Sequence, residues 1–520
     1  MTQNILSWMT FFPLIGIAAI NFVPSRQENL IKWIAASATA VPLALALVLI
    51  SAFDVTNPGP QFVEQFQWIT SIQAEYHMGV DGLSILMILL TAMLSFLCIF
   101  AGWNVKKMVK GYFSMFLLLH VGMMGLFCSL DFFLFFVFWE LMLLPMYFLV
   151  GIWGGEKKEY AAIKFFLYTM AGSVLMLVGM LALFFYSKGP NGDVLPTFNI
   201  LKLAQIDWTQ YKIVIFGSEL PFDKTVWWLL FIGFAVKVPL FPFHTWLPWA
   251  HVQAPTAVSV ILAGVLLKMG TYGMLRLNFT VLPQATEYFA YTMAILGIIN
   301  IIYGAFCAMA QKDIKKLVAY SSVSHMGYCI LGMAVFTPAG MNGAMLQMFN
   351  HGLSAAMMFM LVGVLYDRLH HRYIVTPEGK LGFGGIAQKA PMITAVWTLA
   401  VFAGLGLPGL NGFISESMVF LGAFPVYKTE TIVASLGIVL GAAYLLWMVQ
   451  RVFLGPYTTL HKDTGTGVMH PAHEIPEMTL REWVVLAPLG ILCIWIGVYP
   501  QPFLDFMKTS LGSIIQNIVQ

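Results

Sequence analysis

The sequence predicts an all-α, polytopic membrane protein with about fourteen transmembrane helices. Three observations lead to this fold class: the composition, the recurrence of long apolar segments and the distribution of basic residues. Of the 520 residues, 59% are apolar and only 10% are charged. A soluble domain normally has about a quarter of its residues charged. This chain therefore lacks the polar side chains that would cover a water-exposed surface.

Apolar segments long enough to cross a bilayer recur along the whole chain, each with about 20 mostly apolar residues. The predicted spans are 5–23, 31–53, 80–102, 112–130, 132–153, 162–186, 225–248, 255–279, 287–309, 317–337, 342–366, 391–424, 431–454 and 483–504. The seventh is interrupted by Pro239, Pro242 and Pro248, and the twelfth by a Gly-rich turn around Pro408. Broken backbone is tolerated in a membrane only where it is buried in protein or lines a wet cavity.

The basic residues predict the orientation. Most of the 27 Lys and Arg residues fall in alternate loops, and such loops face the cytoplasm. Both termini are therefore expected on the outer side, with Arg276 among the few basic residues assigned to that side. The first span lacks the flank and cleavage site of a signal peptide, so we expect it to be retained. The stretch 187–224 is expected to hold a short outer element, and 505–520 to be an amphipathic surface segment.

Composition and motifs exclude several function classes. The five cysteines show no C-x-x-C spacing, so disulfides, zinc and iron–sulfur clusters are not expected. A net charge of +3 is too weak to indicate a nucleic-acid partner. The sequence contains no phosphate-binding loop of the G-x-x-x-x-G-K-[ST] type. We therefore predict neither a cofactor nor a metal in this chain, and its energy source must lie elsewhere.

Polar features recur at a five-span interval, which predicts two inverted five-helix repeats. Glu140 lies in the second span of one block and His325 in the second span of the next. The fourth span of each block is the broken one, with Lys237 close to the first break and Glu416 close to the second. Paired interruptions of this kind indicate an inverted-repeat transport fold. The predicted domains are 1–110 (three N-terminal spans), 111–280 (first repeat), 287–454 (second repeat) and 455–520 (C-terminal loop, last span and tail).

Six ionisable residues lie well inside the predicted spans and form the candidate proton path. They are Glu140, Lys237, Lys268, His325, His351 and Glu416. A lysine or aspartate at a span centre costs roughly 2.5 to 3.5 kcal/mol, so intramembrane ionisable groups are functional by default. Structural alternatives remain open: Glu140 and Lys237 as an ion pair between helices, Lys268 reaching toward a helix end, and Glu416 as a helix cap.

Spacing places the two path histidines on polar stripes of otherwise apolar helices. Ser321 precedes His325 by four residues, and Gln347 precedes His351 by four. Residues four apart lie on one helix face, so Ser321 and Gln347 are predicted to line the path. Small polar residues also hold helices together by hydrogen bonds, which keeps a structural alternative open for both histidines.

Three further histidines carry weaker predictions. His244 lies beside the first break, among Phe241, Phe243 and Trp246. It either lines the path or packs under these aromatic rings. His251 and His120 are expected to be structural histidines whose nitrogens are hydrogen-bonded in the core.

Several runs carry a family resemblance. They are His77-Met-Gly-Val-Asp81-Gly-Leu-Ser84, Phe138-Trp-Glu140-Leu-Met-Leu-Leu-Pro145, Lys237-Val-Pro239-Leu-Phe-Pro242-Phe-His244-Thr-Trp-Leu-Pro248, Ala250-His251-Val-Gln-Ala-Pro255, Leu267-Lys268-Met-Gly-Thr-Tyr-Gly, Asp313-Ile-Lys315-Lys316-Leu-Val-Ala-Tyr-Ser321-Ser322 and Asn350-His351. These runs resemble the antiporter-like subunits of respiratory complex I, the NADH–quinone oxidoreductase. That family also includes subunits of multi-protein cation/proton antiporters.

The resemblance implies that Glu140, Lys237, Lys268, His325 and His351 form a proton path. Glu416 stands where two large sister subunits of complex I carry lysine, so the chain is similar to the third. A proton-translocating subunit of the membrane arm is implied, driven by quinone reduction elsewhere in the complex. FMN, iron–sulfur clusters and quinone would then belong to partner subunits. The partners would be the sister antiporter-like subunits and the lipid bilayer.

The length of the chain and its Lys-rich loops favour a bacterial inner membrane over a mitochondrial one. Two alternative functions remain: a subunit of a cation/proton antiporter without a redox partner, and a purely structural scaffold of the membrane arm. The same fold serves all three, so Glu416 and the similarity of the motifs are what favour the complex I subunit.

Overall fold

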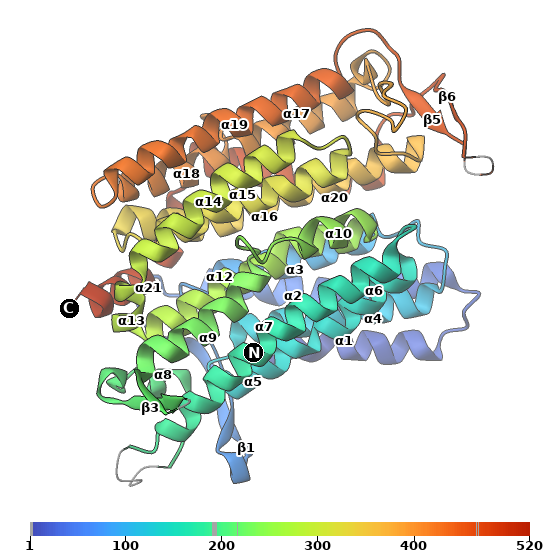
Figure 1. The fold of residues 1–520 in the computed structure, drawn as a ribbon. Coiled ribbons are helices and arrows are strands. Elements are labelled where there is room, and N and C mark those ends of the chain that lie inside the picture. The colour runs from blue at the N-terminus through green and yellow to red at the C-terminus, as the bar shows by residue number, and fades with distance from the viewer. Residues whose placement is uncertain (1–3, 190–194, 216, 464, 466, 520) are drawn as a thin grey trace.

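Long apolar helices run side by side through the molecule, as the composition predicts (Figure 1). The structure is a computed structural model, and it describes residues 4–189, 195–215, 217–463, 465 and 467–519. Within them, ten helices are long and apolar enough to cross a membrane. Most of the described chain is helical, and its strands form three two-stranded hairpins.

The N-terminal part contributes three helices and a hairpin. Its elements are α1 (Ile5–Phe22), α2 (Glu28–Ala52), β1 (Gln61–Ile69), η1 (Thr70–Ile72), β2 (Ala74–Val80) and α3 (Ile85–Ala101). The antiparallel hairpin β1–β2 was not predicted, and β1 projects from the bundle in Figure 1. Its strands alternate poorly: β2 is buried almost throughout, whereas most of β1 is exposed. The sequence of β2 nevertheless has the period-2 pattern of a strand, because Ala74, Tyr76, Met78 and Val80 alternate with Glu75, His77 and Gly79. This signal was overlooked.

The first predicted repeat contains one broken helix and one helix with π-helical turns. Its elements are α4 (Val109–Cys128), α5 (Phe132–Leu141), α6 (Leu143–Trp153), α7 (Lys158–Tyr186), α9 (Phe222–Lys237), α10 (Trp246–Gln253), α11 (Thr256–Ile261), η3 (Leu262–Leu266), α12 (Leu267–Gly273) and η4 (Met274–Phe279). The break between α9 and α10 follows Lys237, because Pro239 and Pro242 cannot donate backbone hydrogen bonds. A stretch of short elements lies between α7 and α9, as predicted, and its position on the outer side stays a prediction. It consists of α8 (Ile200–Leu203), η2 (Trp208–Gln210), β3 (Lys212–Ile215) and β4 (Ser218–Pro221).

The second predicted repeat follows the short helix α13 (Pro283–Tyr288). Its elements are α14 (Ala290–Met309), α15 (Ile314–Met333), α16 (Pro338–Leu369), η5 (Ile386–Gln388), α17 (Pro391–Leu405), α18 (Asn411–Ala423) and α19 (Lys428–Val452). The break between α17 and α18 turns at Gly406 and Gly409, whose φ angles are +77° and +91°. Residues with a Cβ rarely adopt such angles, which explains why glycine stands at both positions.

The C-terminal part adds a short hairpin and two helices to the bundle. It consists of β5 (Leu460–Lys462), β6 (Met469–Pro471), α20 (Leu480–Val498) and α21 (Gln501–Val519). Helix α21 is the predicted amphipathic segment. It packs against the bundle through Ser510, whose hydroxyl accepts a hydrogen bond from the Gly82 amide at 3.0 Å.

The predicted count of about fourteen spans remains a prediction. Four of the predicted spans do not meet the length and composition test. Helix α3 is 17 residues long, two spans are each divided into two short helices, and α15 is rich in polar residues. Three of them, the two divided spans and α15, carry the predicted path residues Lys237, Glu416 and His325.

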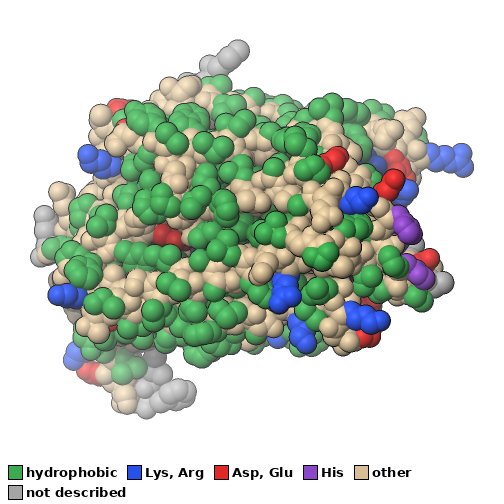
Figure 2. Space-filling model, turned by 90° about the horizontal axis from the view of Figure 1, so that it is seen from above, with side chains coloured by type: hydrophobic (Ala, Val, Ile, Leu, Met, Phe, Trp, Pro, Cys, Tyr) green, Lys and Arg blue, Asp and Glu red, His purple; other side chains and the backbone are tan. Residues whose placement is uncertain are grey.

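Apolar side chains cover most of the face shown in Figure 2, and most of its Lys and Arg side chains lie at or toward one end. In Figure 1 that end carries β5 and β6, whereas α8, α13 and α21 lie at the other. A broad apolar belt with charged ends is the surface that a bilayer requires.

Candidate functional site: a buried line of ionisable groups

Lys268 and His351 form a direct contact in the centre of the molecule. The Nζ of Lys268 lies 2.7 Å from Nδ1 of His351 and 2.5 Å from the carbonyl oxygen of Ala263. Both side chains are buried. Lys268 stands on α12 between two π-helical turns, a distortion that is frequent at functional sites. A lysine ammonium has only donors, so His351 Nδ1 is its acceptor whenever the lysine is charged.

His325 and Glu416 form a second buried contact, with Nδ1 and Oε1 3.2 Å apart. Gln347 donates from Nε2 to the same Glu416 oxygen at 3.3 Å, and it accepts a hydrogen bond from Ser415. The two path histidines lie next to each other, with ring centroids 5.4 Å apart. Four of the six predicted groups are thus brought into one line, which runs Lys268, His351, His325, Glu416.

The helix-cap alternative for Glu416 is wrong. The N-cap of α18 is Leu410, and no side chain caps it. Glu416 lies further along the helix and uses its carboxylate for His325 and Gln347. Gly406 approaches it closely: a Cβ added to Gly406 would lie 2.9 Å from Oε2 of Glu416. The break and the carboxylate therefore occupy one compact site.

Glu140 and Lys237 are neighbours but do not form the salt bridge that the sequence suggested. Lys237 is fully buried, and neither its Nζ nor Oε1 of Glu140 has a hydrogen-bond partner among the described residues. The carboxylate still acts electrostatically on the ammonium group. The Nζ lies 5.1 Å from the ring centroid of Trp139 and 5.8 Å from that of Phe165. Cation–π contacts therefore hold Lys237 where a direct ion pair was expected.

The remaining predicted residues lie around this line. Ser321 hydrogen-bonds the Val318 carbonyl oxygen of its own helix, and the hydroxyl of Tyr444 approaches it from α19. His244 is buried near the end of the segment between α9 and α10, with its ring centroid 5.1 Å from that of Tyr303. Its Nδ1 has no hydrogen-bond partner among the described residues. The prediction that His244 lines the path therefore stays open.

His251 is a residue that sequence reasoning misjudged. It was expected to be hydrogen-bonded, as was His120 on α4. Both ring nitrogens of each histidine lack a partner among the described residues, although both side chains are fully buried. The His251 ring stacks on Phe359 with centroids 4.4 Å apart and planes 8° apart. Lys315 and Lys268 are the charged groups that act on it electrostatically. An unsatisfied buried imidazole costs about 1 to 3 kcal/mol. What distinguishes His251 from His120 is the electrostatic influence of Lys268, a residue of the line.

A polar cavity opens near His251 at the end of the molecule that carries β5. Its volume is about 270 Å³, and we call it the basic pocket. Its charged and imidazole lining residues are Glu156, Lys315, His370, His371, Arg372 and Lys462. Lys315 is buried and donates from Nζ to the Ala254 carbonyl oxygen at 2.6 Å, where α10 ends. Burial lowers the pKa of His371, which lies in the loop after α16.

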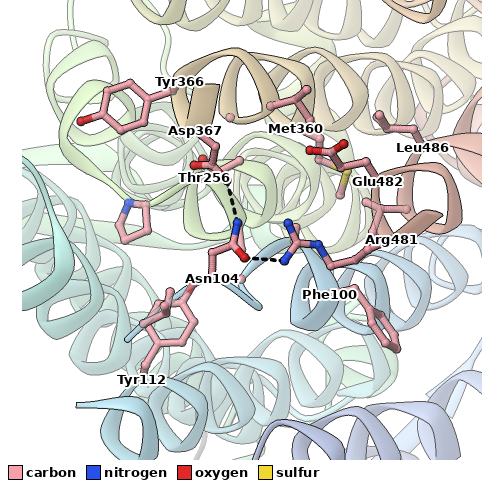
Figure 3. A pocket seen from close by; sticks show the side chains of 18 residues that line it. Phe100, Asn104, Tyr112, Thr256, Met360, Tyr366, Asp367, Arg481, Glu482 and Leu486 are labelled. Carbon is pink, nitrogen blue, oxygen red and sulfur yellow. Dashed lines mark hydrogen bonds between the residues drawn. The ribbon is translucent and has the colours of Figure 1, made fainter. Parts of the chain in front are cut away.

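A second cavity of about 240 Å³ lies beside the basic pocket and shares four lining residues with it: Pro255, Thr256, Gly363 and Tyr366. Figure 3 shows Asn104 at its centre, donating to Asp367 at 2.9 Å and accepting from Arg481 at 2.6 Å. No predicted path residue lines this cavity.

A buried salt bridge outside the line was also missed. Arg276 was assigned to the outer side, but it lies within η4 and is only 3% exposed. Its guanidinium binds both carboxylate oxygens of Asp81 at 2.6 and 2.7 Å, and its Nε donates to the hydroxyl of Tyr272 at 3.1 Å. A buried charge is tolerable when it is paired in this geometry. The count of basic residues in predicted loops does not reveal such a pairing, because it uses sequence position alone.

No cluster of three or more His, Cys, Asp or Glu side chains suited to a metal ion occurs among the described residues. The chemistry that the line supports is the transfer of protons between neighbouring acids and bases.

Comparison with known proteins identifies the family of the chain. The model of the family described as NADH:quinone oxidoreductase/Mrp antiporter, transmembrane, matches residues 129–441. NADH-quinone oxidoreductase subunit M of Rhodobacter capsulatus is 40% identical over 99% of this chain and 97% of its own length. Subunit M of Rickettsia conorii is 39% identical over 98% of each chain.

The fold is shared with two solved assemblies. A chain of respiratory complex I from Thermus thermophilus with bound NADH gives a TM-score of 0.84 at 26% identity, with 99% of both chains covered. A chain of the Mrp complex from a Dietzia species gives 0.81 at 20% identity, also over 99% of both chains, which shows the fold alone. On the full-length identity to its curated relatives, the chain belongs to the subunit M family of NADH–quinone oxidoreductases, the family that its motifs predict.

Proposed function

We propose that this chain translocates protons in the membrane arm of a respiratory NADH–quinone oxidoreductase, driven by quinone reduction elsewhere in the complex. The observation that carries the proposal is the run of buried contacts from Lys268 through His351 and His325 to Glu416. Acid and base groups in direct contact, inside an apolar bundle, are the arrangement that proton relays use in membranes. The membership of the subunit M family supports it.

The path that we propose begins at Lys237. When the electrostatic hold of Glu140 on this lysine loosens, a proton or charge moves toward Lys268. The direct contact then passes it to His351, and the neighbouring His325 delivers it to Glu416. Each charge moved against the membrane potential costs about 2.3 kcal/mol per 100 mV. Redox chemistry in partner subunits, which would hold FMN, iron–sulfur clusters and quinone, must supply that energy.

The basic pocket is our candidate for proton uptake from the cytoplasm. His251 directly precedes Val252, Gln253 and Ala254, which line the pocket. The charges of Lys315 and Lys268 act on it, and both its nitrogens are unpartnered among the described residues. A neutral imidazole accepts a proton at one nitrogen and releases one from the other. We therefore add His251 to the six predicted path residues, and keep His244, Ser321 and Gln347 as lining residues.

The orientation and environment are also proposals. The chain is a multi-pass membrane protein, and its curated relatives here are bacterial, which supports a bacterial inner membrane. Both termini would lie on the periplasmic side, because the loops rich in Lys and Arg would then face the cytoplasm. The partners would be the sister antiporter-like subunits and the surrounding lipid.

A cation/proton antiporter subunit is the second candidate, since the Dietzia chain shares the fold. Purification of the chain from its native membrane tests the choice. Recovery with flavin- and iron–sulfur-containing partners, and NADH-driven proton uptake by the vesicles, is the expected result. Recovery in an assembly without redox centres that exchanges Na⁺ for H⁺ would overturn the proposal.

A further inference from the structure

Asn300 on α14 joins the first broken helix to the helix of His325. Its side chain is fully buried. The Oδ1 accepts a hydrogen bond from the Phe241 amide at 2.7 Å. The Nδ2 donates to the carbonyl oxygens of Pro239 and Val323, each at 3.2 Å. One amide thus binds two backbone groups of the α9–α10 break and one of α15.

The groups that Asn300 binds are those which the break leaves unpaired. A helix end exposes carbonyl and amide groups with no partner inside the helix. The Trp246 indole satisfies one of them, the Val236 carbonyl oxygen, at 2.8 Å. The carbonyl of Pro239 and the amide of Phe241 are satisfied from the other half of the molecule, by Asn300. Two of the backbone groups of the break are therefore bound to α14.

Helices α14 and α15 form a closely packed pair. Gly304 faces α15 so closely that an added Cβ would lie 2.7 Å from the Ser324 amide nitrogen. The Ser324 hydroxyl donates to the Ile301 carbonyl oxygen at 2.8 Å, next to Asn300. Val323 precedes His325 by two residues on the same helix. Asn300 and this closely packed pair thus connect the break to the helix that holds the imidazole.

We propose that Asn300 is a positioning residue that couples the break at Lys237 to His325. It does not carry protons, because an amide side chain does not titrate. Through the hydrogen bonds of Asn300, the position of His325 depends on the geometry of the break at Lys237. The inference rests on the proposed function, since a coupling has meaning only if both ends belong to one path. A purely structural asparagine would stabilise the break and leave the two halves independent.

The test uses the assembled oxidoreductase in sealed native membrane vesicles, with NADH-driven quinone reduction and proton uptake divided by complex content. Asn300→Leu removes all three hydrogen bonds at similar volume. The matched control is Asn278→Leu, a fully buried asparagine whose Nδ2 donates only to the Trp227 carbonyl oxygen at 3.0 Å. We expect the Asn300 variant to lose about threefold or more in turnover per assembled complex. The control should retain its turnover per complex.

Asn300→Asp separates coupling from stability. It keeps an acceptor for the Phe241 amide, but a carboxylate has no donor for Pro239 or Val323, whereas a protonated carboxyl has one. The turnover of this variant relative to the native protein should therefore rise as the pH falls, and that of Asn300→Leu should not. Equal pH profiles for both variants, or failure of both to assemble, would show a merely structural role and overturn the proposal.

A double-variant cycle completes the test. If Asn300 transmits the state of the Glu140–Lys237 region, then Asn300→Leu should cause no further loss in a Glu140→Gln background. If the loss of turnover in the double variant equals the product of the losses in the two single variants, the coupling is contradicted. Normal pumping by Glu140→Gln alone is a different result, since it contradicts the proposed path and not the link.

Discussion

Lys268 meets a base and not an acid: its Nζ lies 2.7 Å from Nδ1 of His351, and no salt bridge of this lysine forms among the described residues. A buried lysine without a fixed counter-charge is expensive to keep protonated. The adjacent imidazole of His351 can accept the proton of Lys268. This contact makes Lys268 the most informative position to change.

Replacement of Lys268 by alanine should block proton transfer between the two halves and lower NADH-driven proton uptake by about a hundredfold. Lys268→Arg should also fail, because a guanidinium does not release its proton in a protein. Both variants are measured in sealed vesicles with complex content determined separately. Full pumping by the arginine variant would remove Lys268 from the path.

Glu140→Gln should leave the complex assembled while proton pumping and quinone reduction fall together. The substitution keeps the shape of the side chain and removes the charge that acts on Lys237. No salt bridge is broken, so we expect little loss of assembly, which quantitative immunoblotting checks. Unchanged pumping in this variant would leave Glu140 with no role in the path.

Glu416→Asp should retain more activity than Glu416→Ala. The shorter carboxylate still titrates, but it must reach His325 across a gap that is now about one methylene longer. Alanine removes the proton-accepting group and also leaves Gln347 without its acceptor. Equal turnover of the two variants at equal assembly would show that the carboxylate is not needed.

His251→Phe should preserve the fold and impair proton uptake. Phenylalanine keeps the ring that stacks on Phe359 but has no nitrogen, so the expected loss reaches about a hundredfold if every proton passes through His251. His120→Phe is the matched control, because His120 is a fully buried histidine on α4 outside the line. A loss of the same size in the control would point to packing.

Acidification should loosen the loop around His371. The ring is neutral in the fold: Nε2 lies 2.7 Å from the Leu460 carbonyl oxygen, and Nδ1 accepts from the Tyr373 amide at 3.3 Å. Burial lowers the pKa of His371 below its ordinary value near 6.5. The neutral His371 ring therefore stabilises the folded loop fully above about pH 6.5. This stabilisation is lost as the pH falls through the lowered pKa.

Hydrogen exchange at the Tyr373 amide, corrected for intrinsic rates, measures that effect between about pH 7.5 and 5. Exchange should accelerate on acidification in the native protein. His371→Asn removes the titrating group, so its protection should no longer depend on pH. A pH-dependent loss that persists in the asparagine variant would assign the effect to another group.

The sequence by itself determined the membrane fold class, the two breaks and the family. Apolar segment length and proline placement act locally, so they can be read without tertiary contacts. Lys268 and Glu416 could also be identified from the sequence, because an ionisable side chain inside a membrane span costs free energy whatever its orientation. The motifs around these residues led to the subunit M family, which the relatives confirm.

Only the tertiary structure decided which of these groups touch. Lys268 and His351 are 83 residues apart in sequence, and His325 and Glu416 are 91 apart, so their contacts depend on how four helices pack. For the same reason the expected ion pair of Glu140 and Lys237 is replaced by aromatic contacts. The bare nitrogens of His251 and the pairing of Arg276 with Asp81 were equally hidden. Residue type sets what a buried group needs, but the packing of distant segments decides whether that need is met.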